Sequence, residues 1–318
     1  MAKENVMQSF ERIAKKKKQG LLHEYWKHKE LFLLLLPAVI YFIVFHYAPM
    51  YGILIAFEDF LPRSGILGSE WVGLQNFSKM FSGLYFWPVF RNTLVISFLK
   101  LIVGFPMPII LALLLNEVSC QWFKKSVQTI TYLPHFIGWV VLAGIVQQVL
   151  SPSTGAVNYV IKALGGTPIF FMGSTRWFRP VVVLSSIWRN CGWDSIIYLA
   201  AVSGIDPTMY EAANLDGATR FQKIWYVTLP SLIPTITIML IFALGGVMND
   251  DFDQIYNMLN AKVMSVGDVI GTYTYRTGLQ QMNYSYATAV GLFKNVIALF
   301  LVSLSNWFSK KISGSSLW

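Results

Sequence analysis

The sequence predicts an all-α membrane protein with about six transmembrane helices. Of its 318 residues, 55% are hydrophobic and only 13% are charged, whereas a soluble domain usually carries about 25% charged residues. Several apolar runs are close to 20 residues long, the length that crosses a bilayer as a helix. A helix also satisfies its own backbone hydrogen bonds, as lipid requires.

The apolar runs define six expected spans. The second run contains Pro106 and Pro108, so we expect it to be kinked there. The predicted spans are Leu31–Phe57, Asn92–Leu115, Val127–Leu150, Phe178–Ala201, Leu232–Met248 and Tyr286–Phe308.

The net charge of +9 is concentrated near the N-terminus, where Lys15–Lys18 precede the first apolar run. This pattern predicts contact with anionic lipid rather than with nucleic acid. No small-residue cleavage site follows a short apolar region, so no removable signal peptide is expected. We expect a basic cytoplasmic segment at 1–30, a membrane domain at 31–308 and a cytoplasmic tail at 309–318.

The distribution of Lys and Arg predicts the orientation. Fourteen of them lie in the two terminal segments and in the loops after spans two and four, against eight in the opposite loops. Cytoplasmic loops are the ones enriched in Lys and Arg. Both termini are therefore expected in the cytoplasm, and so is the loop after span four, which contains Glu211.

That loop, about 206–230, has the pattern of a helix-turn-helix elbow. Asp206 can cap a short helix over 208–215, with Pro207 at the first helical position. Gly217 permits a sharp turn. A second short helix is expected over 218–227, and Leu229-Pro230 begins the fifth span. A structural loop between two membrane helices needs none of these features, which indicates a docking element.

The same segment closely resembles the EAA loop of ATP-binding-cassette importer permeases. Glu211, Ala212, Ala213, Gly217, Leu229 and Pro230 match the family pattern, and Val227 replaces an isoleucine. The resemblance implies that the elbow is the coupling helix that fits a cleft on an ATPase subunit. It assigns this role to Glu211, Ala212, Ala213, Asp216 and Gly217.

Two further stretches narrow the resemblance. Trp71–Phe77 followed by Phe90–Leu94 is similar to maltose-type sugar permeases, and Phe252–Tyr256 followed by Asp268–Leu279 resembles the LplB-like branch, which is associated with oligosaccharides from polysaccharides. The family implies a type I importer permease fold, a second related permease, two ATPase subunits, an external solute-binding protein and an oligosaccharide substrate. The chain has no phosphate-binding loop pattern, so ATP and Mg are expected in the partner ATPase and no cofactor or metal in this chain.

Polar residues inside the spans mark candidates for the substrate path, because ionisable groups in a membrane are costly. Trp188, Arg189, Asn190 and Trp193 in span four combine aromatic rings with planar polar groups, as a sugar site requires. Asn190 and Asp194 are four residues apart and share a helix face. The alternative is that this cluster makes interhelical hydrogen bonds or ion pairs.

A second group of candidates lies in and before span six. Lys294 could pair with an acidic sugar such as a uronate, as in importers of pectin or alginate fragments, or with an acidic residue near Asp250. A neutral sugar remains an alternative. The acidic residues Asp250, Asp251 and Asp253 lack the glycine and distal glutamate of a calcium-binding loop. The candidates are Asn249, Asp250, Asp253, Tyr256, Lys294 and Asn295.

Two other functions stay open from the residues alone. One is a permease for another solute, such as a peptide or an amino acid. The other is a membrane-embedded glycan enzyme, although no catalytic Ser/His/Asp set can be recognised.

Cys120 and Cys191 are isolated, one expected on a cytoplasmic loop and one inside a helix. The aromatic residues of the loop after span one (Trp71, Phe77, Phe81, Tyr85, Phe86, Trp87) suit either an interfacial belt or an external docking surface.

Overall fold

The computed structural model of the chain describes residues 28–249 and 251–313. The chain divides into two compact units, Met1–Leu54 and Ile55–Trp318, which are described separately. Most of the expected basic segment 1–30, part of the tail 309–318 and the candidate residue Asp250 lie outside the described residues.

The first unit contains most of one long helix. α3 (Lys29–Phe42) continues through a π-helical turn at Ile43–Tyr47 into a 3₁₀ segment at Ala48–Phe57, so that 29 residues form one continuous helix. None of the residues of α3 is buried. A helix that is apolar on all sides beyond its first two residues and has no buried face is typical of a segment surrounded by lipid or by another chain. The predicted first span is confirmed in position and length.

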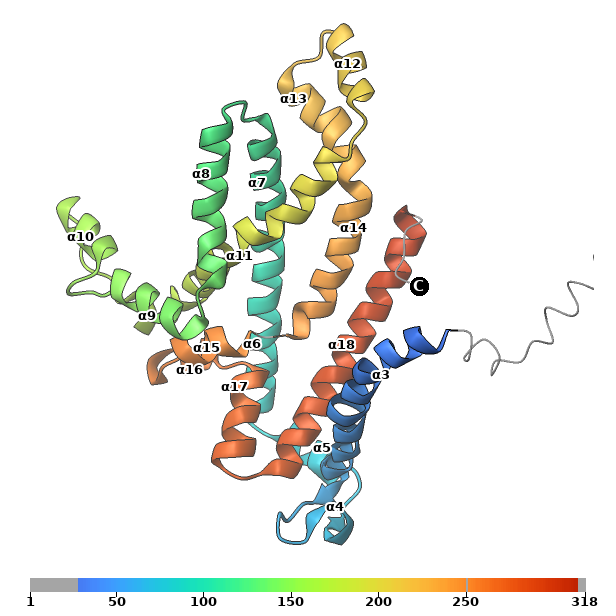
Figure 1. The fold of residues 1–318 in the computed structure, drawn as a ribbon. Helices are drawn as coiled ribbons and strands as arrows, with labels where there is room; N and C mark the ends of the chain where they lie inside the picture. Colours follow the sequence, from blue (N-terminus) through green and yellow to red (C-terminus); the bar gives the residue numbers. More distant parts are fainter. Residues whose placement is uncertain (1–27, 250, 314–318) are drawn as a thin grey trace, which may run out of the picture. The chain divides into compact units, whose positions relative to one another are not determined.

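The second unit contains the remaining long helices (Figure 1). The predicted second span is α6 (Phe86–Leu99) and α7 (Pro106–Glu117), joined by a π-helical turn at Lys100–Gly104. The α-helical hydrogen-bonding pattern is thus interrupted directly before Pro106, as expected for a proline. The fourth span is α11 (Phe178–Ser203), the fifth is α14 (Leu229–Gly245) and the sixth is α18 (Tyr284–Ser313).

The third predicted span is a bent pair of helices. α8 (Gln121–Tyr132) and α9 (Trp139–Val149) meet at an angle of 109°. Pro134 lies in the 3₁₀ turn at Leu133–Phe136 that ends α8, and Gly138 is extended before α9. Among the described residues, four helices are long and apolar enough to cross a membrane, or five if this bent pair counts as one. α11, at the position of the predicted fourth span, is not among these helices. It is 26 residues long and carries the charged residues Arg179, Arg189 and Asp194.

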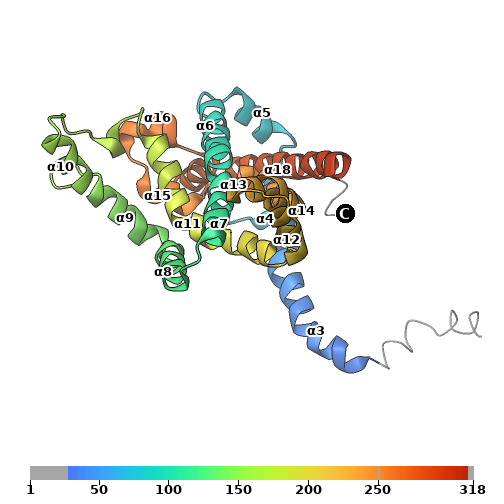
Figure 2. The same cartoon turned by 90° about the horizontal axis from the view of Figure 1, so that it is seen from above.

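Packing in the second unit centres on α11. It contacts α7 and α8, and α14 packs against α18 (Figure 2). One core cluster gathers around Phe178 and Val182 of α11, with Ile255 and Val269. A second cluster joins Met80 and Phe86 to Val290 of α18.

Short elements connect the long helices. β1 (Glu58–Asp59) pairs with β2 (Glu70–Trp71) in an antiparallel register, Glu58 opposite Trp71. The other short helices are α4 (Gly65–Gly68), α5 (Gln75–Ser82), α10 (Ala156–Ala163), α15 (Phe252–Met258), α16 (Met264–Gly267) and α17 (Ile270–Tyr275). Of the expected aromatic belt, Trp71, Tyr85 and Trp87 are exposed, but Phe86 is fully buried and belongs to the core.

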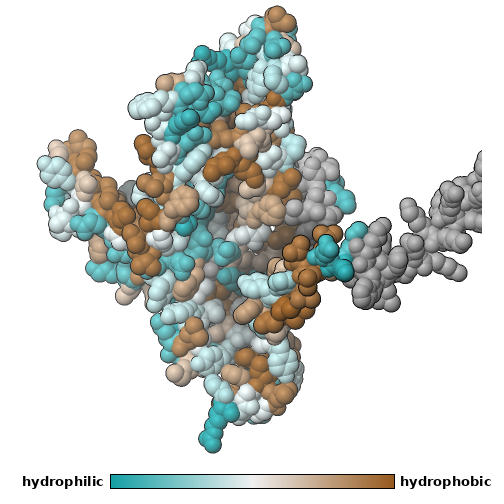
Figure 3. All heavy atoms as spheres, in the orientation of Figure 1, coloured by the Kyte–Doolittle hydropathy of each residue, from teal (hydrophilic) through white to brown (hydrophobic). Residues whose placement is uncertain are grey.

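The loop after α11 forms the elbow, with α12 (Pro207–Leu215) and α13 (Arg220–Lys223). Figure 1 places it at the same end of the unit as the turn between α7 and α8. Hydrophilic residues gather at this end in Figure 3, and hydrophobic residues gather along α9 and α10. Cys120 is exposed in the α7–α8 turn, and Cys191 lies within α11, so the predicted loop and helix positions of the two cysteines are confirmed.

Candidate functional site

The first helix of the elbow begins as the sequence predicts. Asp206 Oδ1 accepts a hydrogen bond from the backbone N–H of Thr208 at 2.9 Å, and Pro207 occupies the first helical position. The backbone N–H of Thr208 and, to a smaller extent, its side chain form hydrogen bonds with the Asp206 carboxylate. These bonds favour the charged form and so lower the pKa of the carboxyl from its usual value. α12 then runs to Leu215, as expected.

The turn and the second half of the elbow differ in part from the expectation. Gly217 has φ +73°, which a residue with a side chain disfavours, so the predicted glycine turn is confirmed. The helix that follows begins at Arg220 and runs without a break to Met248. The expected separate helix over 218–227 is therefore the first part of the fifth span. Thr219 and Gln222 form a capping box at its start.

Two hydrogen bonds brace the elbow. The hydroxyl oxygens of Tyr210 and Thr228 lie 2.9 Å apart, and Lys223 Nζ donates to Asn214 Oδ1 at 2.9 Å. Both join α12 to the helix that leads into α14. The elbow is thus tied to the membrane helix at two points.

The coupling candidates lie on the accessible side of the elbow. A hollow of about 390 Å³ is lined by Ala212, Ala213, Asp216 and Gly217, together with residues of the helix that follows the turn, such as Gln222 and Tyr226. Glu211 is exposed next to it. Large apolar side chains surround the hollow without being covered: Leu215 is 89% exposed, and Phe221 and Tyr226 are also largely exposed. Such an apolar patch beside small residues is typical of a surface that another protein covers.

A cavity lined by several substrate candidates lies among α15, α17 and α18. Its volume is about 600 Å³, within the range of roughly 300–1,000 Å³ found for ligand pockets. Asn249, Lys294 and Asn295 line it together. The structure thus brings three of the sequence candidates to one cavity.

Aromatic rings form one side of this cavity. Phe252 and Tyr275 line it, with their ring centroids 5.3 Å apart. Tyr256 stacks on Phe252 at 5.1 Å and meets Tyr275 edge-on at 5.2 Å. The candidate Tyr256 therefore supports the cavity wall. Asp253 is exposed on α15, and its backbone carbonyl accepts from Asn257 Nδ2 at 2.7 Å.

The span-four candidates lie elsewhere. Trp188 lines a separate apolar cavity of about 550 Å³ between α9, α10 and α11. Arg189 Nε donates to the backbone carbonyl of Ile137 at 3.2 Å, and its guanidinium lies 5.1 Å from the ring centre of Trp139. These contacts hold the joint between α8 and α9 against α11.

Trp193 and Asn190 contribute to the same joint. Trp193 stacks on His135 with ring centroids 4.7 Å apart, and His135 Nδ1 lies 3.3 Å from Asn190 Oδ1. Asn190 and Asp194 line one small cavity, as their spacing predicts. In this structure the cluster makes the interhelical contacts that the sequence left open as the alternative to a sugar site.

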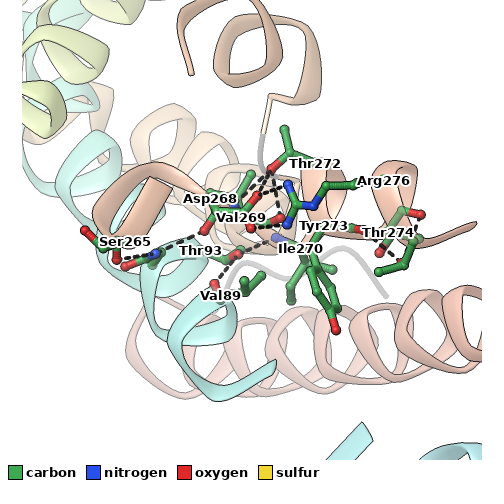
Figure 4. A network of polar contacts seen from close by, with 12 residues as sticks. Val89, Thr93, Ser265, Asp268, Val269, Ile270, Thr272, Tyr273, Thr274 and Arg276 are labelled. Carbon is green, nitrogen blue, oxygen red and sulfur yellow. Dashed lines mark hydrogen bonds and ion pairs between the residues drawn. The ribbon is translucent and has the colours of Figure 1, made fainter. Parts of the chain in front are cut away.

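A polar network holds α17, one wall of the 600 Å³ cavity (Figure 4). The Asp268 carboxylate accepts from the Thr272 hydroxyl at 2.8 Å and pairs with the Arg276 guanidinium through two hydrogen bonds. Thr93 Oγ1 of α6 accepts from the backbone N–H of Ile270 at 2.9 Å. The residues 268–279 that carried the narrower resemblance thus fix α17 to α6.

Comparison with known proteins identifies the family. Residues 104–314 match the family described as the binding-protein-dependent transport system inner membrane component. The chain belongs to this family.

Individual relatives agree with this assignment. The permease is 44% identical over 304 residues to the polygalacturonan/rhamnogalacturonan transport system permease protein YteP of Bacillus subtilis (strain 168), covering 96% of this chain and 95% of YteP. It is 43% identical to Protein LplB of the same strain, covering 92% of each chain.

A solved structure extends the comparison to the fold. The permease superposes with a TM-score of 0.87 and 41% identity on a chain from the crystal structure of a bacterial alginate ABC transporter in complex with an alginate pentasaccharide-bound periplasmic protein. The match covers 93% of this chain and 99% of that chain. The predicted type I ABC importer permease fold is confirmed, and the chain is a transport subunit of the membrane rather than an enzyme.

Sequence reasoning noted Lys100 and Asp251 as ionisable groups in the spans, but it missed the contacts and positions of several residues that shape the permease's cavities. Lys100 forms an ion pair with Asp251 that no local pattern indicates, since the two residues are 151 positions apart. The capping box at Thr219 could have been predicted from the sequence, because Thr-x-x-Gln before a helix is its signature. Tyr275 stood inside the branch motif but carried no sign of facing a cavity.

Proposed function

We propose that this permease imports oligosaccharides that carry carboxylate groups, handed over by an external solute-binding protein. The observation that carries the proposal is the agreement of its relatives. YteP is named for polygalacturonan and rhamnogalacturonan, and the structurally matched transporter is described with alginate. All three polysaccharides contain uronic acids, so the shared chemistry is a sugar ring with a carboxylate.

The 600 Å³ cavity is the proposed substrate site. Phe252 and Tyr275 offer ring faces to the apolar C–H surface of a sugar, and Asn249 and Asn295 offer amide groups to its hydroxyls. Lys294 supplies a cation to the same cavity. Ionisable groups inside membrane-spanning helices often mark substrate paths, and we propose that Lys294 binds a uronate carboxylate during transport.

The elbow is the proposed site of energy coupling. Permeases of this family are driven by ATP hydrolysis in separate ATPase subunits, and we assign the contact with them to Glu211, Ala212, Ala213, Asp216 and Gly217. A second, related permease completes the path across the membrane. Both termini and the elbow would lie in the cytoplasm, which the excess of Lys and Arg on that side supports.

Uptake by the purified transporter tests the substrate class. Proteoliposomes would contain this chain, its partner permease and the ATPases, with the binding protein added outside. We expect ATP-dependent uptake of trigalacturonate and a marked loss of uptake in Lys294→Gln. Transport of maltotriose or a tripeptide in place of the uronate would contradict the proposed substrate class.

Coupling is tested separately with Glu211→Lys. We expect this variant to assemble and to retain ATP hydrolysis, while substrate uptake per ATP falls sharply, because the exposed carboxylate is replaced by a cation at the ATPase contact. Leu67→Lys, at an exposed side chain of α4 outside the elbow, serves as the control and should leave coupling unchanged. Undiminished uptake by Glu211→Lys would remove the elbow's proposed role.

A further inference from the structure

Lys100 lies in the π-helical turn between α6 and α7, half-way along the second span. Its Nζ donates to Asp251 Oδ2 and to Gln254 Oε1, both at 2.6 Å. The two oxygen ligands come from the segment between α14 and α15 and from α15 itself. The Lys100 ammonium thus links the second span to the start of α15, where Phe252 lines the 600 Å³ cavity.

The two ligands of Lys100 differ in how firmly they are held. Gln254 is fully buried, and its Nε2 donates to the Val182 carbonyl at 2.7 Å and to Ser185 Oγ at 3.0 Å. These bonds fix the amide with its oxygen toward Lys100. Gln254 is therefore a permanent ligand of the cation.

Asp251 is the outer ligand. Its side chain is 40% exposed, whereas that of Lys100 is 16% exposed. Its backbone adopts the left-handed conformation with φ +43° and ψ +60°, which aspartate tolerates better than most residues. The partly exposed carboxylate of Asp251 can leave Lys100 more readily than the buried amide of Gln254 can.

The position of Asp251 also indicates where a second carboxylate could approach. Asn249 and Phe252, on either side of it in sequence, line the 600 Å³ cavity. On the other side, Lys100 lines a cavity of only about 110 Å³ that also contains Asp194. An anion would be repelled by Asp194 there, so the open approach to Lys100 is from the side that Asp251 covers.

We propose that Lys100 is a carboxylate-binding residue of the substrate path, and that Asp251 is an internal carboxylate that a uronate of the substrate displaces. The inference rests on the proposed function. It adds a second carboxylate-binding cation to Lys294, which lines the 600 Å³ cavity. It also explains why an acidic residue borders a path for an acidic substrate.

Binding to the complete transporter in nanodiscs, without the binding protein, tests this role. The probes are trigalacturonate and its fully methyl-esterified form, which has the same rings without charge. For Lys100→Gln we expect the Kd of trigalacturonate to rise about tenfold or more, since a hydrogen bond to a charged group is lost. The Kd of the methyl ester should stay within about twofold. Asp251→Asn should bind trigalacturonate more tightly than the wild type, because the competing carboxylate is gone.

A purely structural ion pair would give a different pattern. The double variant Lys100→Gln/Asp251→Asn removes both charges, so it should assemble and bind the methyl ester as the wild type does. We expect it to remain weak for trigalacturonate, whereas a structural role predicts full recovery. Lys79→Gln, at an exposed lysine of α5, is the matched control and should bind both probes normally.

The outcomes separate this inference from the proposed function. If the wild type binds trigalacturonate and Lys100→Gln keeps that affinity, or loses both probes equally, the role of Lys100 is refuted and the substrate class stands. A wild-type transporter that binds neither probe would refute the substrate class, and the inference with it.

Discussion

The hydroxyl oxygens of Tyr210 and Thr228 lie 2.9 Å apart, and this contact joins the first helix of the elbow to the start of α14. Thr228 is almost fully buried, and its hydroxyl also lies 3.4 Å from the Lys223 carbonyl. A second hydrogen bond, from Lys223 to Asn214, joins the same two helices nearer to the Gly217 turn. The elbow and the fifth span are therefore expected to move as one body.

Removal of the first link should loosen this connection. Tyr210→Phe deletes one hydroxyl and should cost about 1 kcal/mol of stability, the usual contribution of a hydrogen bond. Because α12 would then move more freely against α14, we expect more ATP to be hydrolysed per substrate imported. The ratio of ATP hydrolysis to uptake in proteoliposomes measures this effect. Tyr159→Phe, at an exposed tyrosine of α10, should leave the ratio unchanged, and an equal change in both variants would contradict the argument.

Gly192 allows the closest approach of α11 to α8. A Cβ atom at this position would lie 2.1 Å from the Thr131 carbonyl oxygen, so the two helices would have to separate. Overpacking of this kind usually costs about 1–3 kcal/mol. We expect Gly192→Ala to lower the thermal stability of the solubilised transporter and to disturb the joint between α8 and α9.

A second glycine provides the comparison. Gly144 lies inside α9, and a Cβ there would meet no atom within 4 Å. Since alanine favours a helix over glycine by roughly 0.5–1 kcal/mol, Gly144→Ala should preserve or raise the melting temperature. Equal stability of the two alanine variants would show that the α8–α11 contact is not tight.

Asn158 organises the loop that contains α10. Its Nδ2 donates to the carbonyls of Leu150, Ser151 and Ile169, and its Oδ1 accepts from the Ile169 N–H at 2.7 Å. Asn158→Ala would leave these groups without their partner, which costs about 1–3 kcal/mol. We expect a lower melting temperature and earlier protease cleavage between α9 and α11. Asn257→Ala removes one exposed hydrogen bond and should change stability by less than about 0.5 kcal/mol.

The cap of α12 makes the elbow sensitive to acid. Because the folded pKa of Asp206 lies below its unfolded value, the charged cap stabilises α12 above that unfolded pKa, and this contribution is lost as the pH falls through the folded pKa. Amide protection of 207–215, corrected for the intrinsic pH dependence of exchange, should decline as the pH falls below the reference Asp pKa of about 3.9. Asp206→Asn retains a capping oxygen without titrating, so a decline of the same size in that variant would contradict this cause.

The parts of the fold that the sequence predicted are those set by local rules. The Asp206-Pro207 cap and the Gly217 turn each depend on residues a few positions apart, and both are confirmed. The bend in the third span was not predicted, because the hydropathy continues across Pro134 and Gly138 while the chain turns by 109° there. The apolar pattern reports that a segment suits a membrane, but it does not report the direction of the segment.

The candidate cavity could be predicted only in part. Asn249, Lys294 and Asn295 were recognised because polar groups in apolar spans are rare, and they line one cavity. Arg189, Asn190 and Trp193 had the same polar and aromatic composition, yet they contact the joint between α8 and α9. Composition identifies which residues need partners, whereas the partners themselves depend on contacts such as Lys100–Asp251 that are distant in sequence.

The central claim is that the elbow transmits ATP hydrolysis to the membrane helices, and crosslinking from Ala213 tests it most directly. Ala213→Cys would be introduced with Cys120→Ser and Cys191→Ser, so that it is the only cysteine of the chain. Ala213 lines the hollow of the elbow and is partly exposed. In membrane vesicles we predict a crosslink to the ATPase subunit and no labelling by a membrane-impermeant thiol reagent added outside the cell. Labelling from outside, or no crosslink to the ATPase, would contradict the account.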